Sequence, residues 1–277
     1  MLRETWALTR RELKHWYRVK MQVFMTMVQP IVWLGLFGQA FNLQSLIPDV
    51  PGAEAQFSSL FAGAPDYFSF MSVGMLSVIT LFACMFSGMS IVWDRRFGFL
   101  NKLKVAPIPR GIIPLSRVLS TVIRAMIQAG IVFVIALLFL YVPGLTGLGL
   151  RPDFGVLELV GMFLVLFLLS VGFASLFTTI ALGVENQEVL FGVINLINLP
   201  IMFASAALFP TSAMPDWLRA VANFNPLTWA SDALRQMAFN NPDPIWGLGT
   251  EILALALFAG ALVGLSVWLS DRLLSNK

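Results

Sequence analysis

Cysteine and histidine are nearly absent from this sequence, with one of each in 277 residues. Cys84 lies in an apolar run, so the sequence predicts neither an intrachain disulfide nor a cysteine metal site. His15 has no second histidine with which to build a metal site or a catalytic triad. Charge is also scarce, because 12% of the residues are Asp, Glu, Lys or Arg while 58% are hydrophobic. Soluble proteins carry about 25% charged residues, so this composition predicts an integral membrane protein.

The sequence motifs of several enzyme classes are missing as well. There is no GxxxxGK[ST] segment to hold ATP phosphates and no GxSxG nucleophile motif. Nothing in the charge pattern implies nucleic-acid binding. A channel or proton-driven carrier is disfavoured because the apolar runs lack an Asp, Glu or His relay. An intramembrane enzyme acting on lipids is a rival hypothesis, but only Glu185 and Glu188 cluster. Because the ATP-binding motif is missing, active transport would take its energy from another chain.

Six apolar runs are long enough to cross a hydrocarbon core of about 30 Å as helices. They cover residues 21–41, 67–93, 115–142, 155–182, 189–208 and 245–269. Of the 18 Lys and Arg residues, Arg151, Arg219 and Arg235 fall on one side of these runs and the other 15 on the opposite side. Because basic residues collect on the cytoplasmic side, we expect a multi-pass protein of the cell membrane with both termini inside.

Residues 1–20 precede the first run and predict an amphipathic helix on the inner leaflet. Its apolar arc consists of Leu2, Trp6, Leu13, Trp16 and Tyr17.

The loop 94–110 between the second and third runs is dense in basic residues. Large apolar side chains are interleaved with them, and Pro107 and Pro109 prevent a long helix. This pattern predicts a short amphipathic helix at the cytosolic face. Anchoring in lipid headgroups is the alternative to docking on another protein.

Polar side chains inside the apolar runs are candidates for lining a transport pathway. They are Gln29, Gln128, Asn195 and Asn198. Hydrogen bonds between helices are the alternative role for the two asparagines. Arg124, one turn before Gln128, is expected to extend toward the headgroups, with a site role as the alternative.

The segment 209–244 is semi-polar, aromatic and interrupted by prolines. Two short re-entrant helices that dip into the outer leaflet would account for Trp217, Leu218, Leu227 and Trp229.

Three sequence blocks resemble a known family, the membrane subunits of type-2 ABC exporters in their daunorubicin-resistance-like or multidrug branch. The first is the N-terminal helix, and the second runs from Asp94-Arg95-Arg96-Phe97-Gly98-Phe99-Leu100 through Ala106-Pro107. The third contains Leu208-Phe209-Pro210, Met214-Pro215-Asp216-Trp217-Leu218, Asn225-Pro226-Leu227-Thr228 and Asp232-Ala233-Leu234-Arg235.

The resemblance implies one all-α membrane domain over 1–277 with six transmembrane helices. Its parts are the interfacial helix 1–20, spans one and two in 21–93, the coupling loop 94–110, spans three to five in 111–208, the outer re-entrant segment 209–244, and span six with a cytosolic tail in 245–277. It further implies a second copy of the chain, two separate ATP-binding subunits that hold ATP and magnesium, and no cofactor bound by this chain.

By the same resemblance, the ATP-binding subunits would push on the coupling loop and on the N-terminal helix. The coupling residues are Arg96, Phe97, Gly98, Phe99, Leu100, Leu103 and Pro107, and the interfacial residues of the N-terminal helix are Trp6, Leu13, Trp16 and Tyr17. The expected cargo is an amphipathic drug-like or lipid molecule, with a polysaccharide or lipid-linked glycan as the alternative.

Overall fold

The computed structural model describes residues 2–18, 24, 28, 31–39, 60–99, 109–240 and 242–275. Within these ranges the regular elements are helices, and none is a strand. The chain begins with α1 (Leu2–Arg18), the π-helical turn η1 (Leu34–Gly38), α4 (Tyr67–Arg96), α6 (Ile112–Leu138) and the 3-10 turn η3 (Phe139–Tyr141). It continues with α7 (Val156–Gly183), α8 (Gln187–Phe203), η4 (Thr211–Ala213), α9 (Asp216–Asn223), α10 (Pro226–Ala238) and α11 (Leu248–Ser275).

Four of these helical segments are long and apolar enough to cross a membrane. They are α4, α6 together with η3, α7 and α11, and they confirm the second, third, fourth and sixth predicted runs. About half of the first predicted run, 21–41, lies outside the described residues, as does most of 42–66. The six-span count therefore stays a prediction.

The fifth predicted run is a shorter helix than expected, because α8 ends at Phe203 and not at 208. The side-chain amide of Asn225 explains this end. Its Nδ2 donates to the carbonyls of Ile201 and Ala204, at 2.7 Å each, which occupies acceptors at the helix terminus. The Oδ1 of the same residue accepts from Leu227 N at 2.9 Å and caps α10.

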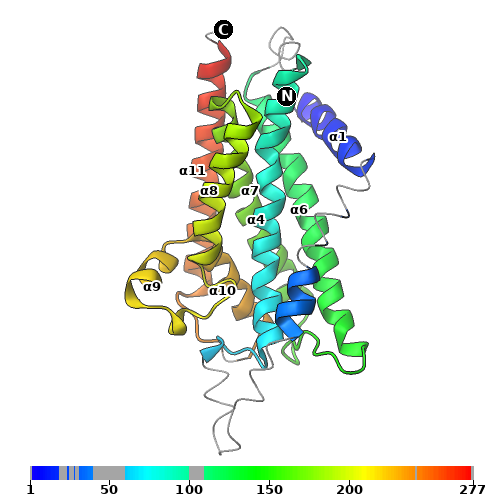
Figure 1. The fold of residues 1–277 in the computed structure, drawn as a ribbon, viewed down its shortest axis with the longest axis vertical. Coiled ribbons are helices and arrows are strands. Elements are labelled where there is room, and N and C mark those ends of the chain that lie inside the picture. The colour runs from blue at the N-terminus through cyan, green and yellow to red at the C-terminus, as the bar shows by residue number, and fades with distance from the viewer. Residues whose placement is uncertain are drawn as a thin grey trace, which may run out of the picture.

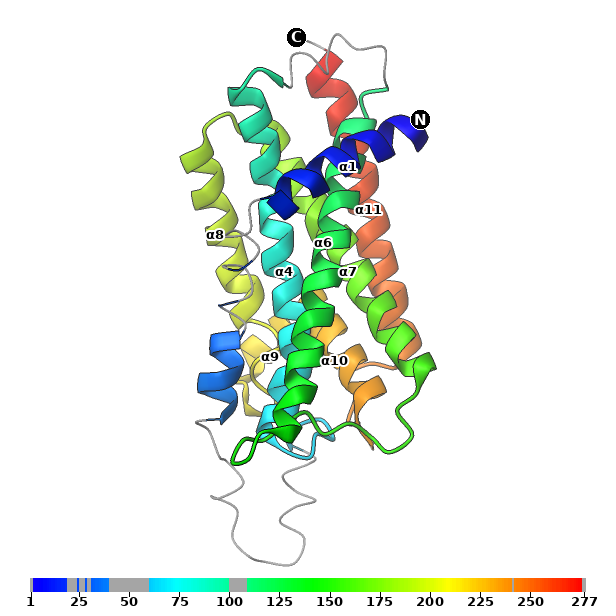
Figure 2. The same cartoon turned by 90° about the vertical axis from the view of Figure 1, so that its right-hand side faces the viewer.

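The long helices run alternately up and down, and both ends of the bundle are distinct (Figures 1 and 2). One end holds α1, the end of α4, the α7–α8 turn and the end of α11. The other end holds α9 and α10. The N-terminal helix and the end of the last helix thus share one side of the molecule.

Helix α4 lies at the centre of the packing, against α6, α7, α8 and α10. Small and hydroxylated side chains let α4 and α7 approach closely. Ser87 Oγ lies 2.8 Å from Thr178 Oγ1, and Gly88 faces the carbonyl of Phe177. At its start α4 is capped by Asp66, which accepts from Ser69 N at 2.7 Å, and burial raises the pKa of this carboxyl.

The segment before the last helix differs from the prediction of two lipid-dipping helices. Helix α9 does expose Trp217. Helix α10, however, packs against α4, α7 and α11 and buries Leu227 completely, and Trp229 stacks on Trp246 with ring centroids 5.8 Å apart. Leu227 and Trp229 therefore serve packing within the protein and not contact with lipid, and the re-entrant depth of the two helices stays a prediction.

Arg235 on α10, which was counted with the basic residues of the outer side, lies inside the protein and not at its surface. Its side chain is buried and donates to the carbonyls of Ala206, Ala207 and Phe70 at 2.7, 2.9 and 3.2 Å. The guanidinium also lies over the Phe70 ring, 3.6 Å from the centroid. It therefore binds the turn after α8 to α4 and α10.

Candidate functional site

The most concentrated polar cluster lies where α1 crosses the ends of α4 and α6. Arg117 of α6 forms ion pairs with both Glu12 of α1 and Asp94 of α4. Arg11 of α1 joins them, 3.2 Å from Glu12 Oε1 and 3.2 Å from Asp94 Oδ1. Arg117 is 3% exposed, and both carboxylates are buried. Three elements far apart in sequence are thus joined by charge in a water-poor place, where an unpaired charge would be costly.

The face of α1 that contacts the bundle is not the predicted apolar arc. Thr9, Glu12 and Trp16 are buried, at a spacing that places them on one side of a helix. Thr9 Oγ1 also lies 3.4 Å from Ser116 O of α6.

The predicted arc of α1 is divided. Trp16 is buried and Leu13 is half-buried, whereas Trp6 and Tyr17 are exposed. Nothing is described for the Leu2 side chain. The two exposed aromatics stay available to lipid or to another chain, as the sequence expected.

The start of the coupling loop belongs to α4, because that helix continues past Trp93 to Arg96. Gly98 then turns the chain with φ of +70°, and its N–H donates to Arg95 O at 3.1 Å. Phe97 is 81% exposed. Phe99 lies under Arg11, whose Cζ is 3.7 Å from the ring centroid. The other predicted contacts, Leu100, Leu103 and Pro107, fall outside the described ranges.

Arg95 connects the same region to the α7–α8 turn. Its Nη1 and Nη2 donate to Val184 O at 2.8 Å and to Leu182 O at 3.0 Å. These carbonyls belong to the end of α7, where a cation is favoured. An open cleft of about 600 Å³ lies between Arg95 and Arg96 on one side and the acidic turn 185–188 on the other.

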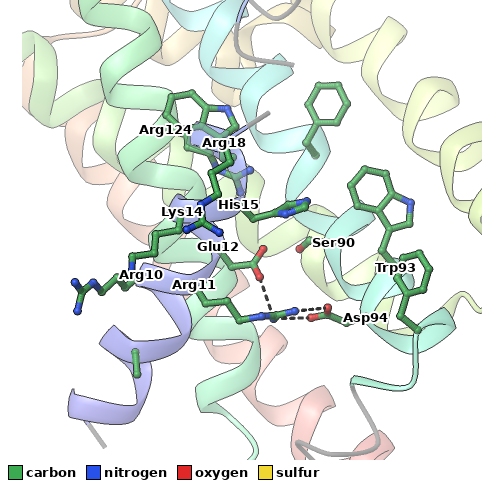
Figure 3. Close-up of a pocket in the computed structure, with 14 residues that line it drawn as sticks. Arg10, Arg11, Glu12, Lys14, His15, Arg18, Ser90, Trp93, Asp94 and Arg124 are labelled. Atoms are coloured by element: carbon green, nitrogen blue, oxygen red, sulfur yellow. Dashed lines mark hydrogen bonds and ion pairs between the residues drawn. The ribbon is translucent and has the colours of Figure 1, made fainter. Parts of the chain in front are cut away.

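A second cavity, of about 530 Å³, lies between α1, α4 and α6 (Figure 3). Arg124 of α6 lines it and is 9% exposed. The side chain hydrogen-bonds within its own helix, from Nε to Ser120 O at 3.2 Å and from Nη2 to Thr121 Oγ1 at 3.1 Å. The favoured interpretation, a side chain extended toward the headgroups, is therefore replaced by a buried position facing a cavity.

The described polar residues that were proposed for a pathway lie on two different helices, Gln128 on α6 and Asn195 and Asn198 on α8. Gln128 and Asn198 are buried within the single chain, and Asn195 is half-buried on α8. Asn195 Nδ2 donates to Phe191 O, at 2.9 Å. Gln29 lies outside the described residues.

Sequence reasoning missed the ion-paired cluster of Glu12, Asp94 and Arg117. A signal was present, because Glu12 and Asp94 are isolated acids in strongly basic segments and Arg117 is a charge at the edge of an apolar run. Isolated opposite charges near helix ends are candidates for mutual pairing. The described residues contain no group of three or more His, Cys, Asp or Glu side chains that could hold a metal ion.

Comparison with known proteins adds an independent observation. A family described as ABC-2 type transporter matches residues 3–239. A protein named transport permease ycf38 of Cyanophora paradoxa is 31% identical over 93% of this chain and 81% of its own length. Its namesake in Porphyra purpurea is 29% identical over 97% of this chain and 85% of its own length. The daunorubicin resistance ABC transporter permease protein DrrB1 of Streptomyces coeruleorubidus is 26% identical over 80% of this chain and 75% of its own length.

Proposed function

Because this chain belongs to the ABC-2 type transporter family, we propose that it is the permease subunit of an ATP-driven exporter that moves an amphipathic drug-like or lipid substrate out of the cytoplasm or inner leaflet. The observation that carries the proposal is the buried junction of Glu12, Asp94 and Arg117. It joins α1 to the end of α4, the two places that the resemblance assigns to contact with the ATP-binding subunits. Displacement of either segment would be transmitted to α4 and α6 through these buried ion pairs.

The energy would come from two separate ATP-binding subunits that hold ATP and magnesium. We assign their contact on this chain to Arg96, Phe97, Gly98, Phe99, Leu100, Leu103 and Pro107. On α1 the exposed Trp6 and Tyr17 are accessible to the same subunits, whereas Trp16 is buried against the bundle and Leu13 is half-buried. The exposure of Phe97 supports this assignment, since a large apolar side chain at the cytosolic end is suited to fill a partner's pocket.

The membrane topology is proposed as six spans in the cell membrane with both termini in the cytoplasm. The four long apolar helices support it, as does the location of α1 and the end of α11 at one end of the bundle. The other two spans would be 21–41 and α8. At 1.5 Å per residue, the 17 residues of α8 reach about 25 Å, close to the hydrocarbon thickness.

A second copy of the chain would complete the pathway. Helix α8 presents an exposed apolar face that includes Phe191, Leu196 and Leu199. Of the three described polar positions first considered, Asn195 on this helix is the one that an adjacent chain could reach, since Gln128 and Asn198 are buried inside. The drug-resistance name of one relative supports an amphipathic cargo over a polysaccharide.

The test combines partner recovery with ATP hydrolysis. The chain is co-expressed with an ABC ATP-binding subunit encoded beside it, and the complex is purified through a tag on this chain. We expect ATP hydrolysis by the complex and none by the chain alone. Replacing Phe97 and Phe99 by Ala should lower both partner recovery and substrate efflux, with normal membrane insertion.

The control is Tyr141→Ala, since Tyr141 is 83% exposed, like Phe97, but ends the turn η3 after α6, at the opposite end of the bundle. Hydrolysis by the purified chain alone would contradict the proposal. Equal partner recovery with the Phe97/Phe99 double variant would return the loop to the role of a lipid anchor.

A further inference from the structure

The cavity between α1, α4 and α6 carries more positive than negative charge. Its two acids, Glu12 and Asp94, are already paired with Arg117 and Arg11. Four further cations line it, namely Arg10, Lys14, Arg18 and Arg124. None of these four has an ion-pair partner among the described residues. Figure 3 shows Arg10 pointing away from the others, which leaves three cations around the space.

Arg124 is the part of this site that is fixed by the fold. Its described hydrogen-bond acceptors, Ser120 O, Ser120 Oγ and Thr121 Oγ1, are all neutral. A buried guanidinium keeps its charge, and neutral acceptors do not balance it. The nearby carboxylate of Glu12 is held by Arg117. An anionic group in the cavity would supply the missing charge.

The size and walls of the cavity define the kind of anion. A volume of about 530 Å³ is far more than a bare anion needs, and it lies in the usual range of ligand pockets. Trp16, Phe86, Trp93 and Phe97 form part of the wall. Cations at one place and aromatic rings at another match a molecule with an anionic oxygen group and an apolar remainder.

We propose that this cavity binds the phosphate headgroup of an anionic phospholipid from the inner leaflet. Arg124, Lys14 and Arg18 bind the phosphate oxygens, and the aromatic wall contacts the glycerol and the first part of the acyl chains. The cytoplasmic leaflet is rich in anionic lipids and basic surfaces attract them. The bound lipid would be a cofactor of the junction between α1 and the bundle. The inference rests on the proposed orientation, with α1 at the cytoplasmic side, but not on export, so failure of the export proposal would leave it intact.

The test measures lipid binding to the purified, delipidated full chain by native mass spectrometry. The probes are phosphatidylglycerol and phosphatidylcholine with identical acyl chains, and glycerol 1-phosphate is the soluble competitor. We expect one phosphatidylglycerol to bind at least tenfold more tightly than phosphatidylcholine, with little displacement by glycerol 1-phosphate. Arg124→Gln should weaken phosphatidylglycerol binding about tenfold, as loss of a charged hydrogen bond does.

Arg272→Gln is the matched control, because it removes the same charge from the same end of the bundle, outside the cavity lining. It should leave binding unchanged. If Arg124→Gln does not fold, the Lys14→Gln/Arg18→Gln variant carries the test, since both side chains are exposed on α1. Equal affinity for the two lipids, or unchanged affinity in the cavity variants, would overturn the proposal. Displacement by glycerol 1-phosphate at equal concentration would show a site for free anions instead.

Discussion

Arg117 of α6 is paired with Glu12 of α1 in a place that solvent hardly reaches. The same guanidinium pairs with Asp94 at the end of α4. One cation therefore balances acids from two other helices, and the position of α1 depends on it. A helix placed by lipid contact alone would not need such a pair.

Replacing Arg117 by Gln should destabilise the protein severely, because two buried carboxylates would lose their common partner. Breaking a buried ion pair from one side costs about 3–5 kcal/mol. Replacing Glu12 by Gln should destabilise the protein less, because Arg117 keeps its ion pair with Asp94. The measurement is the midpoint of thermal unfolding in detergent, with Arg272→Gln as the exposed control. Similar midpoints for Arg117→Gln and the control would mean that the cluster adds no stability.

The proposed topology predicts which positions an impermeant thiol reagent reaches in intact cells. In a Cys84→Ala background, Thr211→Cys and Asn240→Cys should react from outside, because both lie at the end of the bundle with α9 and α10. Glu188→Cys, in the turn at the other end, should react only after the cells are opened. Reaction of Glu188→Cys in intact cells would reverse the orientation.

The sequence was sufficient for the long helices because runs of apolar residues have few other options in a membrane. The sequence was insufficient where tertiary contacts determine the end of a helix or the burial of a side chain. Asn225 ends α8 early through two carbonyls that lie 21 and 24 residues before it. No local pattern encodes that contact.

The candidate site shows the same division between local and distant information. The amphipathic helix α1 was predicted from its own residues, yet its buried face is set by Ser116 and Arg117, more than a hundred residues away. Arg235 was counted as an outer charge because it lies in the segment between the fifth and sixth predicted runs, a position that does not reveal its burial. The three carbonyls that receive its hydrogen bonds become visible only in the fold.

Gly74→Ala should destabilise the centre of the bundle. A Cβ at Gly74 would overlap the carbonyl of Ala207 and come within 2.6 Å of Arg235 Nη2. Neither neighbour can move freely, because that carbonyl accepts from Arg235 at 2.9 Å. Overpacking of this kind costs about 1–3 kcal/mol or more.

The control for Gly74 is Gly192→Ala in α8, since no described residue lies within 4 Å of a Cβ at Gly192. Alanine is favoured over glycine in a helix by up to about 1 kcal/mol, so this variant should be neutral or stabilised. Thermal unfolding of both variants in one detergent gives the comparison. A stable Gly74→Ala would show that the approach of Ala207 to α4 is not close in solution.

Gly98 should tolerate substitution in the order Asn, Ala, Pro, with Pro the worst. No atom of the described residues lies within 4 Å of a Cβ at this position, so crowding by them does not forbid a side chain. The constraint is its φ of +70°, which costs an ordinary residue about 1–2 kcal/mol and asparagine less. Proline cannot adopt this angle, and it also lacks the N–H that donates to Arg95 O. Since this turn leads the chain from α4 to Phe99 under Arg11, the same order is expected for recovery of the ATP-binding subunit and for efflux. If Ala matched Gly and only Pro failed, the hydrogen bond to Arg95 would be what matters, and the left-handed turn would have no part in coupling.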